Sequence, residues 1–539
     1  MTRNSVGKFA RTESVQKKIV PPTPPSAAGA IDADALKEAL AKISGEAVPQ
    51  SSDDKEAYFM TQVGLGEQLC AQGPMFALPA ALHFYRALRV YPSPVELIMI
   101  YEKTVPEPVF KVGSVSTYDP YGQFLNFVHQ IIMDLTNLDV KSRIEGYYEY
   151  FPQKRMNVSV KETGESKYKI LVAEKDFEAG DVIYKEDPLV VALDSDLQQM
   201  GTHCSHCLRL IHKGMAIKPE SDRLNAIYCS KECQVASKAE SQNLLFTLES
   251  PLPPGMDQGL SSLTKSKREE AQKVFTDYLK STGKTNPLLL ARLLARQISL
   301  ETAKFTPNLP GGIVEPPLTD EGSPGYGISD HIERLRYIDV NALEAERKMI
   351  TEVLGSALPG LESTLPEDKH ALAMGKIAYN AFGVCYSGGR DDKPASAARP
   401  EDQERTRTPY GTSRQIGSGL YVVSAYLAHS CEPNVRPSFS SGTAELHLVA
   451  SRAIKKGDQL TMAFVDVTQH PDETAEQARR RRRFELARGW RFKCECSRCV
   501  SDVTDEAEGD LGVGRDESKV EAAVSRVESG QAGIMPDTD

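Results

Sequence analysis

The chain has 539 residues, which allows several domains of about 100–200 residues each. It carries 26% charged residues, one tryptophan and a net charge of −10, a balance that argues against a general nucleic-acid coat, so we expect no nucleic-acid partner. Eight of the ten cysteines fall into two groups of four, which favours intracellular metal binding over a disulfide scaffold. No apolar run reaches the roughly 18 residues needed to cross a bilayer, so the sequence predicts no transmembrane segment.

Helical patterns dominate the amino-terminal region of the chain, and strand patterns follow. A proline-rich leader, residues 1–31, is predicted to be disordered. Apolar residues at helical spacing predict helices at 31–44, 57–71, 77–90 and 95–103. Later patterns predict strands at 168–173 and 182–193 and helices at 288–300 and 473–486. Because helices come first and strands later, we expect a multidomain α+β protein with separate folding units.

Three phrases in the amino-terminal region point to one family. They read QVGLGEQL at 62–69, YRALRVYP at 85–92 and TVPEPVF at 104–110, and a further match runs over 131–160. Here the sequence resembles the small presequence receptor of the mitochondrial TOM translocase in its fungal form. The resemblance implies an all-α, TPR-like helical domain over 32–160, in which residues 112–130 are an insertion that breaks a helix.

The same resemblance implies a pair of helices with an apolar groove for one face of an amphipathic targeting peptide. Glu67 and Glu96 would lie near the basic face of that peptide. The residues implied to line the groove are Phe59, Met60, Val63, Leu97, Ile100 and Tyr101. The alternative is that this apolar stripe forms the core of the domain. The implied partners are amphipathic targeting peptides or other TOM subunits.

The receptor family carries an amino-terminal membrane anchor, and this sequence shows none. Either the protein works away from the membrane or the start of the sequence is incomplete. The resemblance implies a location on the cytosolic face of the mitochondrial outer membrane. A genuine absence of the anchor would instead favour the cytosol or the nucleus.

The first cysteine group has the spacing of a structural zinc site. Its members are Cys204, Cys207, Cys229 and Cys233. The phrase IYCSKECQ at 227–234 resembles a MYND finger, which holds two zinc ions. Only one of the two ligand sets is present, so we expect a half finger with one zinc over 201–245. Four cysteines already complete that site, so we expect His203, His206 and His212 to be solvated neighbours.

The second group combines three cysteines near the end of the chain with one upstream. Cys494, Cys496 and Cys499 supply three thiolates, and the fourth ligand that tetrahedral zinc needs is expected from Cys431 in the phrase HSCEPN. This pairing resembles a SET domain with its post-SET loop, and together with the finger it resembles the SET-and-MYND family. The resemblance implies a β-rich SET domain with an inserted zinc finger, a helical insert and a post-SET zinc loop. Its implied segments are 161–200 (the opening SET segment), 246–378 (helical insert), 379–467 (SET core), 468–503 (post-SET) and 504–539 (a disordered acidic tail).

The SET resemblance implies S-adenosylmethionine as cofactor and a protein lysine as substrate. The positions implied to contact the cofactor are Asn380, Ala428, His429 and Phe492. Phe464 stands where the family has its catalytic tyrosine, and Ala428 stands where it has asparagine. The opening glycine motif reads Lys167-Tyr168-Lys169. Loss of one preorganised polar group at a reaction centre can lower a rate about 10²–10³-fold, so these departures favour weakened or lost activity.

Two functional hypotheses follow. The first is a presequence receptor or adaptor whose SET unit is structural or a pseudoenzyme. The second is an active protein-lysine methyltransferase that uses the helical module for targeting. A third possibility is that two neighbouring genes were joined in the gene model.

The run Arg479–Arg483 is interpreted as a solvated helix face, with a nuclear or nucleic-acid signal as the alternative.

Overall fold

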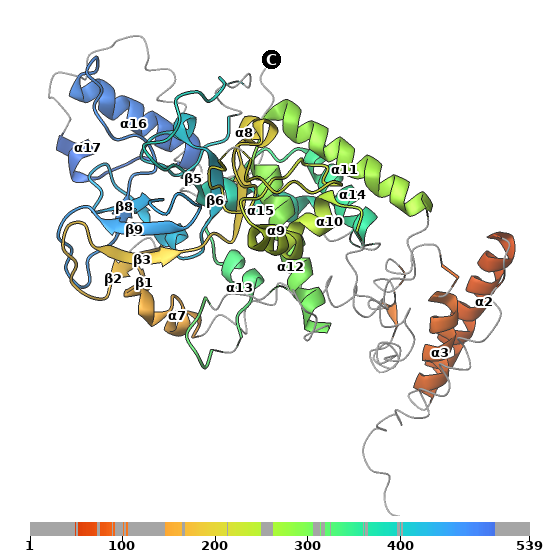
Figure 1. Cartoon of the computed structure of the whole chain (residues 1–539). Helices are drawn as coiled ribbons and strands as arrows, with labels where there is room; N and C mark the ends of the chain where they lie inside the picture. The colour runs from red at the N-terminus through yellow and green to blue at the C-terminus, as the bar shows by residue number, and fades with distance from the viewer. Residues whose placement is uncertain are drawn as a thin grey trace, which may run out of the picture. The chain divides into compact units, whose positions relative to one another are not determined.

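The computed structural model describes the parts of the chain that are coloured in Figure 1. The described residues are 52–72, 76–88, 90–91, 146–163, 168–212, 214–249, 262–305, 318–323, 325–358, 365–395 and 403–501, together with Pro49, Leu97, Tyr101, Thr104, Val105, Ile313, Leu361 and Arg399. The leader, the insertion at 112–130 and the acidic tail named above lie outside the described residues.

The amino-terminal unit contains two helices that pack on each other, α2 (Ser52–Ala71) and α3 (Ala77–Leu88) (Figure 1). The predictions of helices at 57–71 and 77–90 are therefore confirmed. Small residues let the two helices approach closely: a Cβ atom on Gly66 would lie 2.9 Å from the Phe84 ring. Phe84 is buried, and its ring centroid lies 4.8 Å from that of Tyr101. This contact packs Tyr101, which follows the two helices in the chain, against α3.

The second unit contains the strands, which form small sheets rather than one continuous sheet. The hairpin β1–β2 is antiparallel, the orders β3-β9-β8 and β4-β6-β5 describe two three-stranded antiparallel sheets, and β7 pairs with β10 in parallel. The bounds are β1 Val158–Glu162, β2 Lys169–Ala173, β3 Val182–Glu186, β4 Val190–Leu193, β5 Ala381–Val384, β6 Gly417–Leu420, β7 Ala428–His429, β8 Val435–Ser438, β9 Leu446–Ala450 and β10 Thr461–Met462.

Helices surround these sheets in the second unit. The central one, α12 (Asn286–Phe305), is buried along most of its first four turns and packs on β4, α14 and α15. A helix that is apolar on nearly all sides belongs in a core. The run NPLLLARLLARQISL at 286–300 is mostly apolar, which explains why α12 is buried. The remaining bounds are α7 Tyr147–Tyr150, η3 Lys154–Met156, α8 Ser195–Met200, α9 Lys231–Ser237, η4 Lys238–Gln242, α10 Asn243–Phe246, α11 Ser262–Thr282, α13 Ile328–Glu333, α14 Glu344–Ala357, α15 Glu367–Asn380, η6 Thr412–Arg414, η7 Ser424–Tyr426, α16 Ala475–Trp490 and α17 Ser497–Ser501.

Residues 146–160, which the sequence phrases assigned to the receptor-like domain, pack with the second unit. Strand β1 pairs with β2 from Val158 to Glu162, so a boundary at residue 160 runs through a hairpin. The Tyr147 hydroxyl lies 2.5 Å from Nδ1 of His331 in α13, and its ring packs edge-on against Tyr326. Phrase matching follows sequence identity and carries no information on strand pairing, which is why it placed the boundary here.

None of the described helices combines the length and the apolar character that a membrane-crossing helix needs.

Candidate metal centres and cofactor site

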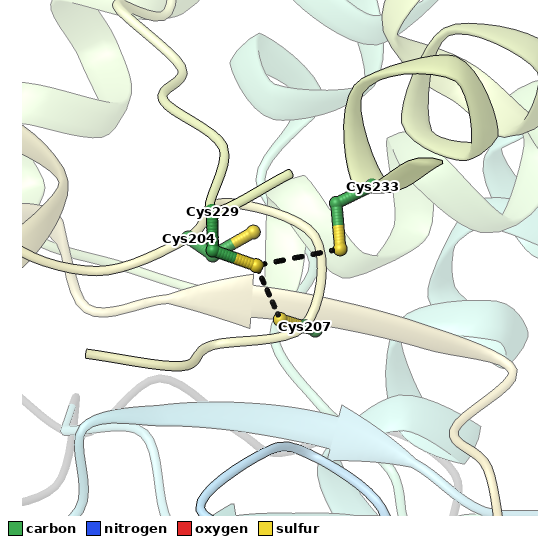
Figure 2. Close-up of side chains that lie close together, drawn as sticks. All are labelled: Cys204, Cys207, Cys229 and Cys233. Carbon is green, nitrogen blue, oxygen red and sulfur yellow. Dashed lines mark hydrogen bonds between the residues drawn. The ribbon is translucent and has the colours of Figure 1, made fainter. Parts of the chain in front are cut away.

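The first cysteine group converges on one point (Figure 2). The Sγ atoms of Cys204, Cys207, Cys229 and Cys233 all lie within 4.8 Å of one another. Cys229 Sγ is 3.6 Å from Cys207 Sγ and 3.6 Å from Cys233 Sγ. Four sulfurs at the Zn–S bond length of about 2.3 Å in a tetrahedron are about 3.8 Å apart, whereas disulfide sulfurs are about 2.05 Å apart. The group therefore fits a zinc ion and could bind one.

Local backbone geometry places these ligands. Leu208 has a φ of 63°, and its N–H donates to the carbonyl oxygen of Cys204 at 2.9 Å, which forms the tight turn between Cys204 and Cys207. On the other side Cys233 lies in the first turn of α9, where its N–H donates to the Ser230 side chain at 3.2 Å. A helix amino terminus favours negative charge, so it suits a thiolate ligand.

The three histidines near this cluster behave differently from one another. The expectation of solvated neighbours is correct for His212, which is exposed, and wrong for His203, which is buried. Burial lowers the pKa of His203, and its Nδ1 lies 2.9 Å from the Thr202 hydroxyl. His206 is half-buried with Nδ1 3.8 Å from a Glu240 carboxylate oxygen. The fold around the finger covers His203, which the spacing of the cysteines could not indicate.

The second group also comes together, although its members are far apart in sequence. The Sγ atoms of Cys431, Cys494, Cys496 and Cys499 lie within 4.8 Å of one another. Cys431 Sγ is 3.5 Å from Cys499 Sγ and 3.9 Å from Cys494 Sγ. These separations again match a tetrahedral zinc site. The predicted pairing of Cys431 with the three late cysteines is confirmed as a cluster that could bind zinc.

The arginine run lies on α16, and it fastens the second cluster to the SET core. Arg479 Nε donates to the carbonyl oxygen of Cys499 at 2.7 Å, and Arg481 pairs with Glu473 at 2.6 Å. Arg482 is completely buried. The interpretation as a solvated face is therefore wrong for Arg482, which is buried, and for Arg479 and Arg481, which are half-buried and bonded to other parts of the chain, whereas Arg480 is exposed.

The candidate cofactor site lies where β7 and β10 run side by side. Their parallel pairing sets His429 opposite Met462, and Nδ1 of His429 accepts a hydrogen bond of 3.1 Å from the backbone N–H of Phe464. Burial lowers the pKa of His429 to about 4, so the ring is neutral at pH 7. The ring centroid of His429 lies 5.4 Å from Phe464 and 5.9 Å from Phe492. Three of the residues expected at the site thus form one aromatic cluster.

The two other positions expected to contact the cofactor have different surroundings. Ala428 precedes His429 in β7 and is half-buried. Asn380 is completely buried, and its amide donates to the carbonyl oxygens of Arg336 at 2.7 Å and Lys376 at 2.8 Å. Its Oδ1 accepts a hydrogen bond of 3.0 Å from Arg407. The hydrogen bonds described for the Asn380 side chain are therefore all made to other groups of the protein.

Sequence reasoning missed two partners of Phe464. The Trp490 ring centroid lies 5.5 Å from that of Phe464, and the Arg407 guanidinium lies 4.3 Å from the same centroid. Phe464 itself is only 2% exposed. The sequence offered a signal for Trp490, the one tryptophan, two positions before Phe492. It offered none for Arg407, which lies in a stretch rich in charged and loop-forming residues.

The segment that replaces the glycine motif is described only over two of its three residues. Lys167 lies outside the described residues, and Tyr168 is 54% exposed with the Arg336 guanidinium 4.4 Å from its ring centroid. Lys169 forms an ion pair with Glu162 across the β1–β2 hairpin. Both side chains are thus engaged within the protein.

The residues expected to line a peptide groove fall into different environments. Met60 is 64% exposed, and Phe59 and Val63 are half-buried. The Phe59 ring packs on Tyr91 with centroids 4.9 Å apart. Leu97 and Tyr101 are buried, Glu67 is exposed, and Ile100 and Glu96 lie outside the described residues. Tyr101 therefore belongs to the core of the unit, which the alternative interpretation expected of the whole stripe.

Comparison with known proteins matches two parts of the chain to two families. Residues 10–114 match the family model described as MAS20 protein import receptor, and residues 169–465 match the model of the SET domain. The mitochondrial import receptor subunit tom20 of Neurospora crassa is 44% identical over 86 residues, which cover 16% of this chain and 47% of that receptor. The chain thus spans about half the length of this relative.

The relatives of the second unit are SET and MYND proteins. A SET and MYND domain-containing protein of Dictyostelium discoideum is 24% identical over 332 residues, covering 60% of this chain and 78% of the relative. The human protein-lysine N-trimethyltransferase SMYD5 is 25% identical over 391 residues, covering 65% of this chain and 88% of the relative. The chain therefore joins an import-receptor-like module to a SET unit related to protein-lysine methyltransferases.

Proposed function

Because this chain belongs to the SET domain family, we propose that its second unit binds S-adenosylmethionine but transfers the methyl group slowly or not at all. We further propose that the first unit is a presequence-receptor-like binding module. The observation that carries the first proposal is Phe464, which lies beside His429 and Phe492 and is enclosed by Trp490 and Arg407.

The cofactor side of the site is supported by its aromatic lining and by the second cysteine cluster. His429 and Phe492 offer ring surfaces suited to an adenine, and zinc bound by the cluster would hold the residues after Phe492 against Cys431. When bound, S-adenosylmethionine supplies an activated methyl group on a sulfonium. Relatives named as lysine methyltransferases support this assignment of the site.

The residues at the expected reaction centre favour slow methyl transfer. Methyl transfer to an amine depends chiefly on orientation in a water-excluded site, and a tyrosine hydroxyl at the reaction centre would help to orient the reacting groups. Phe464 has no hydroxyl, and loss of one such group can lower a rate about 10²–10³-fold. Ala428 removes a further polar side chain at the same site. An active methyltransferase remains the alternative, since each single change is tolerable.

The receptor-like proposal rests on similarity and on exposed apolar side chains. On α2, Met60 is 64% exposed, and Val63, three residues further on along the same helical face, is half-buried. Large apolar side chains on one helix suit the apolar face of an amphipathic peptide. The similarity to an import receptor supports a role in targeting at the mitochondrial outer membrane.

The decisive experiment is a calorimetric titration of the zinc-loaded full chain with S-adenosylmethionine. We expect micromolar binding that Phe492→Ala abolishes. Phe484→Ala is the matched control, because Phe484 is a 42% exposed aromatic on the neighbouring helix α16 and packs on Arg488. It should leave the affinity unchanged. A folded wild-type protein that shows no binding heat would overturn the cofactor assignment.

A methyl-transfer assay on the same preparation separates the two functional candidates. Binding without transfer supports the pseudoenzyme, and transfer at a rate typical of enzymes, about 1 per second or faster, supports the active alternative.

A further inference from the structure

Arg407 is a completely buried cation in an aromatic surrounding. Its guanidinium lies 4.3 Å from the ring centroid of Phe464, 4.9 Å from that of Tyr379 and 5.6 Å from that of Phe382. Among the described residues, no carboxylate forms an ion pair with it. Aromatic rings attract a cation most strongly where water is excluded, so these rings form a site that is selective for positive charge.

The backbone around Arg407 adds to a sheet edge in the manner of a bound peptide. In the order β4-β6-β5, strand β5 has one free edge, and Arg407 forms a parallel bridge with Phe382 on it. The Arg407 N–H donates to the carbonyl oxygen of Ala381 at 2.8 Å, and Gly383 N–H donates to the Arg407 carbonyl oxygen at 3.1 Å. Strand addition of this kind is a common mode of peptide recognition.

The segment is fitted closely to that edge. A Cβ atom on Gly383 would lie 2.9 Å from the Thr406 hydroxyl and 3.2 Å from Cβ of Thr408. On its far side, Thr408 N–H donates to the carbonyl oxygen of Phe464 at 3.1 Å. The segment 406–408 therefore lies between β5 and Phe464, the residue that stands where the family has its tyrosine.

We propose that the segment 406–408 is an intramolecular pseudosubstrate, and that Arg407 fills an aromatic cation site suited to the side chain of a lysine. The proposal rests on the proposed function, because it takes Phe464 to mark the reaction centre. Like a lysine, Arg407 carries its charge at the end of an aliphatic stem, but it cannot give up a proton to become a nucleophilic amine at pH 7. The site is thus occupied by a cation that does not react.

A simpler structural role would also bury an arginine here. Its Nε and Nη1 donate to the carbonyl oxygens of Tyr379 and Ala425, each at 2.9 Å, and so tie two segments together. Arg268 offers a matched comparison, because it is also completely buried and donates to the carbonyl oxygens of Glu249 and Asn243, both at 2.7 Å. The experiment must therefore detect selectivity for a cation rather than loss of stability.

The test measures thermal unfolding of the zinc-loaded full chain with n-butylammonium, which mimics a lysine side chain, and with 1-butanol as its uncharged counterpart. We expect n-butylammonium, but not 1-butanol, to raise the midpoint of Arg407→Ala by about 2–4 °C. Neither compound should shift wild-type protein or Arg268→Ala. Equal shifts by both compounds, or none by either, would overturn the proposal.

A second variant covers the case in which Arg407→Ala does not fold. Gly383→Ala keeps the arginine at position 407 in the sequence but crowds the segment 406–408 off the edge of β5, so the Arg407 side chain should leave the site and open it to n-butylammonium in the same assay. No cation-specific shift in this folded variant would count against the proposal. Calorimetry with S-adenosylmethionine on the same samples keeps the two questions apart, since failure of cofactor binding rejects the proposed function, whereas a missing cation effect rejects only the pseudosubstrate.

Discussion

Glu186 is a buried carboxylate at the end of β3 that organises the turn leading to β7. It accepts hydrogen bonds from the N–H groups of Val423 and Ser424 at 2.7 and 2.9 Å, and from the Ser424 hydroxyl at 2.6 Å. Burial nevertheless dominates and raises the pKa of Glu186 to about 7. The protonation state of Glu186 is thus coupled to the turn that precedes His429.

The pH dependence of stability follows from that pKa. The folded state holds the Glu186 proton more tightly than the unfolded state, whose pKa is about 4.5. Its contribution is therefore fully present below about pH 4.5 and is lost as the pH rises through about 7. At one pKa unit per 1.36 kcal/mol, the loss is on the order of 3 kcal/mol. We expect Glu186→Gln to flatten this decline in urea unfolding measured from pH 4.5 to 8.

The control for that measurement is Glu178→Gln, which changes an exposed carboxylate in the turn before β3. It should keep the wild-type slope. If Glu186→Gln and wild type lose stability in parallel across this range, the carboxylate of Glu186 is not the group that titrates.

At the level of the element, the helix pair α2–α3 shows how one position controls packing. Gly66 faces the Phe84 ring, whereas a Cβ atom on Gly64, one half-turn away, would meet no atom within 4 Å. Both glycines lie inside the same helix, so alanine has the same effect on the backbone at either position. Only the packing around the two positions differs.

Alanine at these two glycines should therefore have opposite effects. Overpacking against Phe84 should make Gly66→Ala cost about 1–3 kcal/mol, less a small gain in helix propensity. Gly64→Ala should stabilise the helix by about 0.5–1 kcal/mol. Amide hydrogen exchange in α2 and α3 measures both changes locally. Faster exchange in Gly64→Ala, or slower exchange in Gly66→Ala, would contradict the packing described here.

Features with local chemical signatures were predictable from the sequence, and features made by burial were not. The spacing of Cys204, Cys207, Cys229 and Cys233 indicates a metal site, because the ligands must lie within a short distance of one ion. Helix α12 was predictable from its apolar period. Nothing in the sequence distinguishes Arg407 or Glu186 from the many exposed charged residues, since only tertiary packing removes them from water.

The two cysteine clusters lie in different parts of the second unit, so we expect each part to depend on its own metal ion. Cys431→Ser should reduce bound zinc from two ions per chain to one, because only the second cluster loses a ligand. Elemental analysis of the full chain measures this directly. Cys385→Ser is the matched control, since Cys385 is also buried and lies outside both clusters. It should retain both ions.

Hydrogen exchange on the same variant shows where the lost ion acted. We expect faster exchange in β7, which ends two residues before Cys431, and in α17, which contains Cys499, and no change in the finger or in α2 and α3. Two zinc ions retained in Cys431→Ser, or faster exchange confined to the finger, would contradict the assignment of ligands.

The position of Cys431 and Cys499 also has a consequence for the order of events during synthesis. The finger can close as soon as Cys233 leaves the ribosome, because all its ligands lie within 204–233. The second cluster must wait for Cys499, which lies late in the chain. Helices α2 and α3 emerge long before that point, and domains fold as they are made. A nascent chain therefore exposes its import-receptor-like first unit while its SET unit is still incomplete. A protein that binds the first unit can reach the chain before the SET unit has folded.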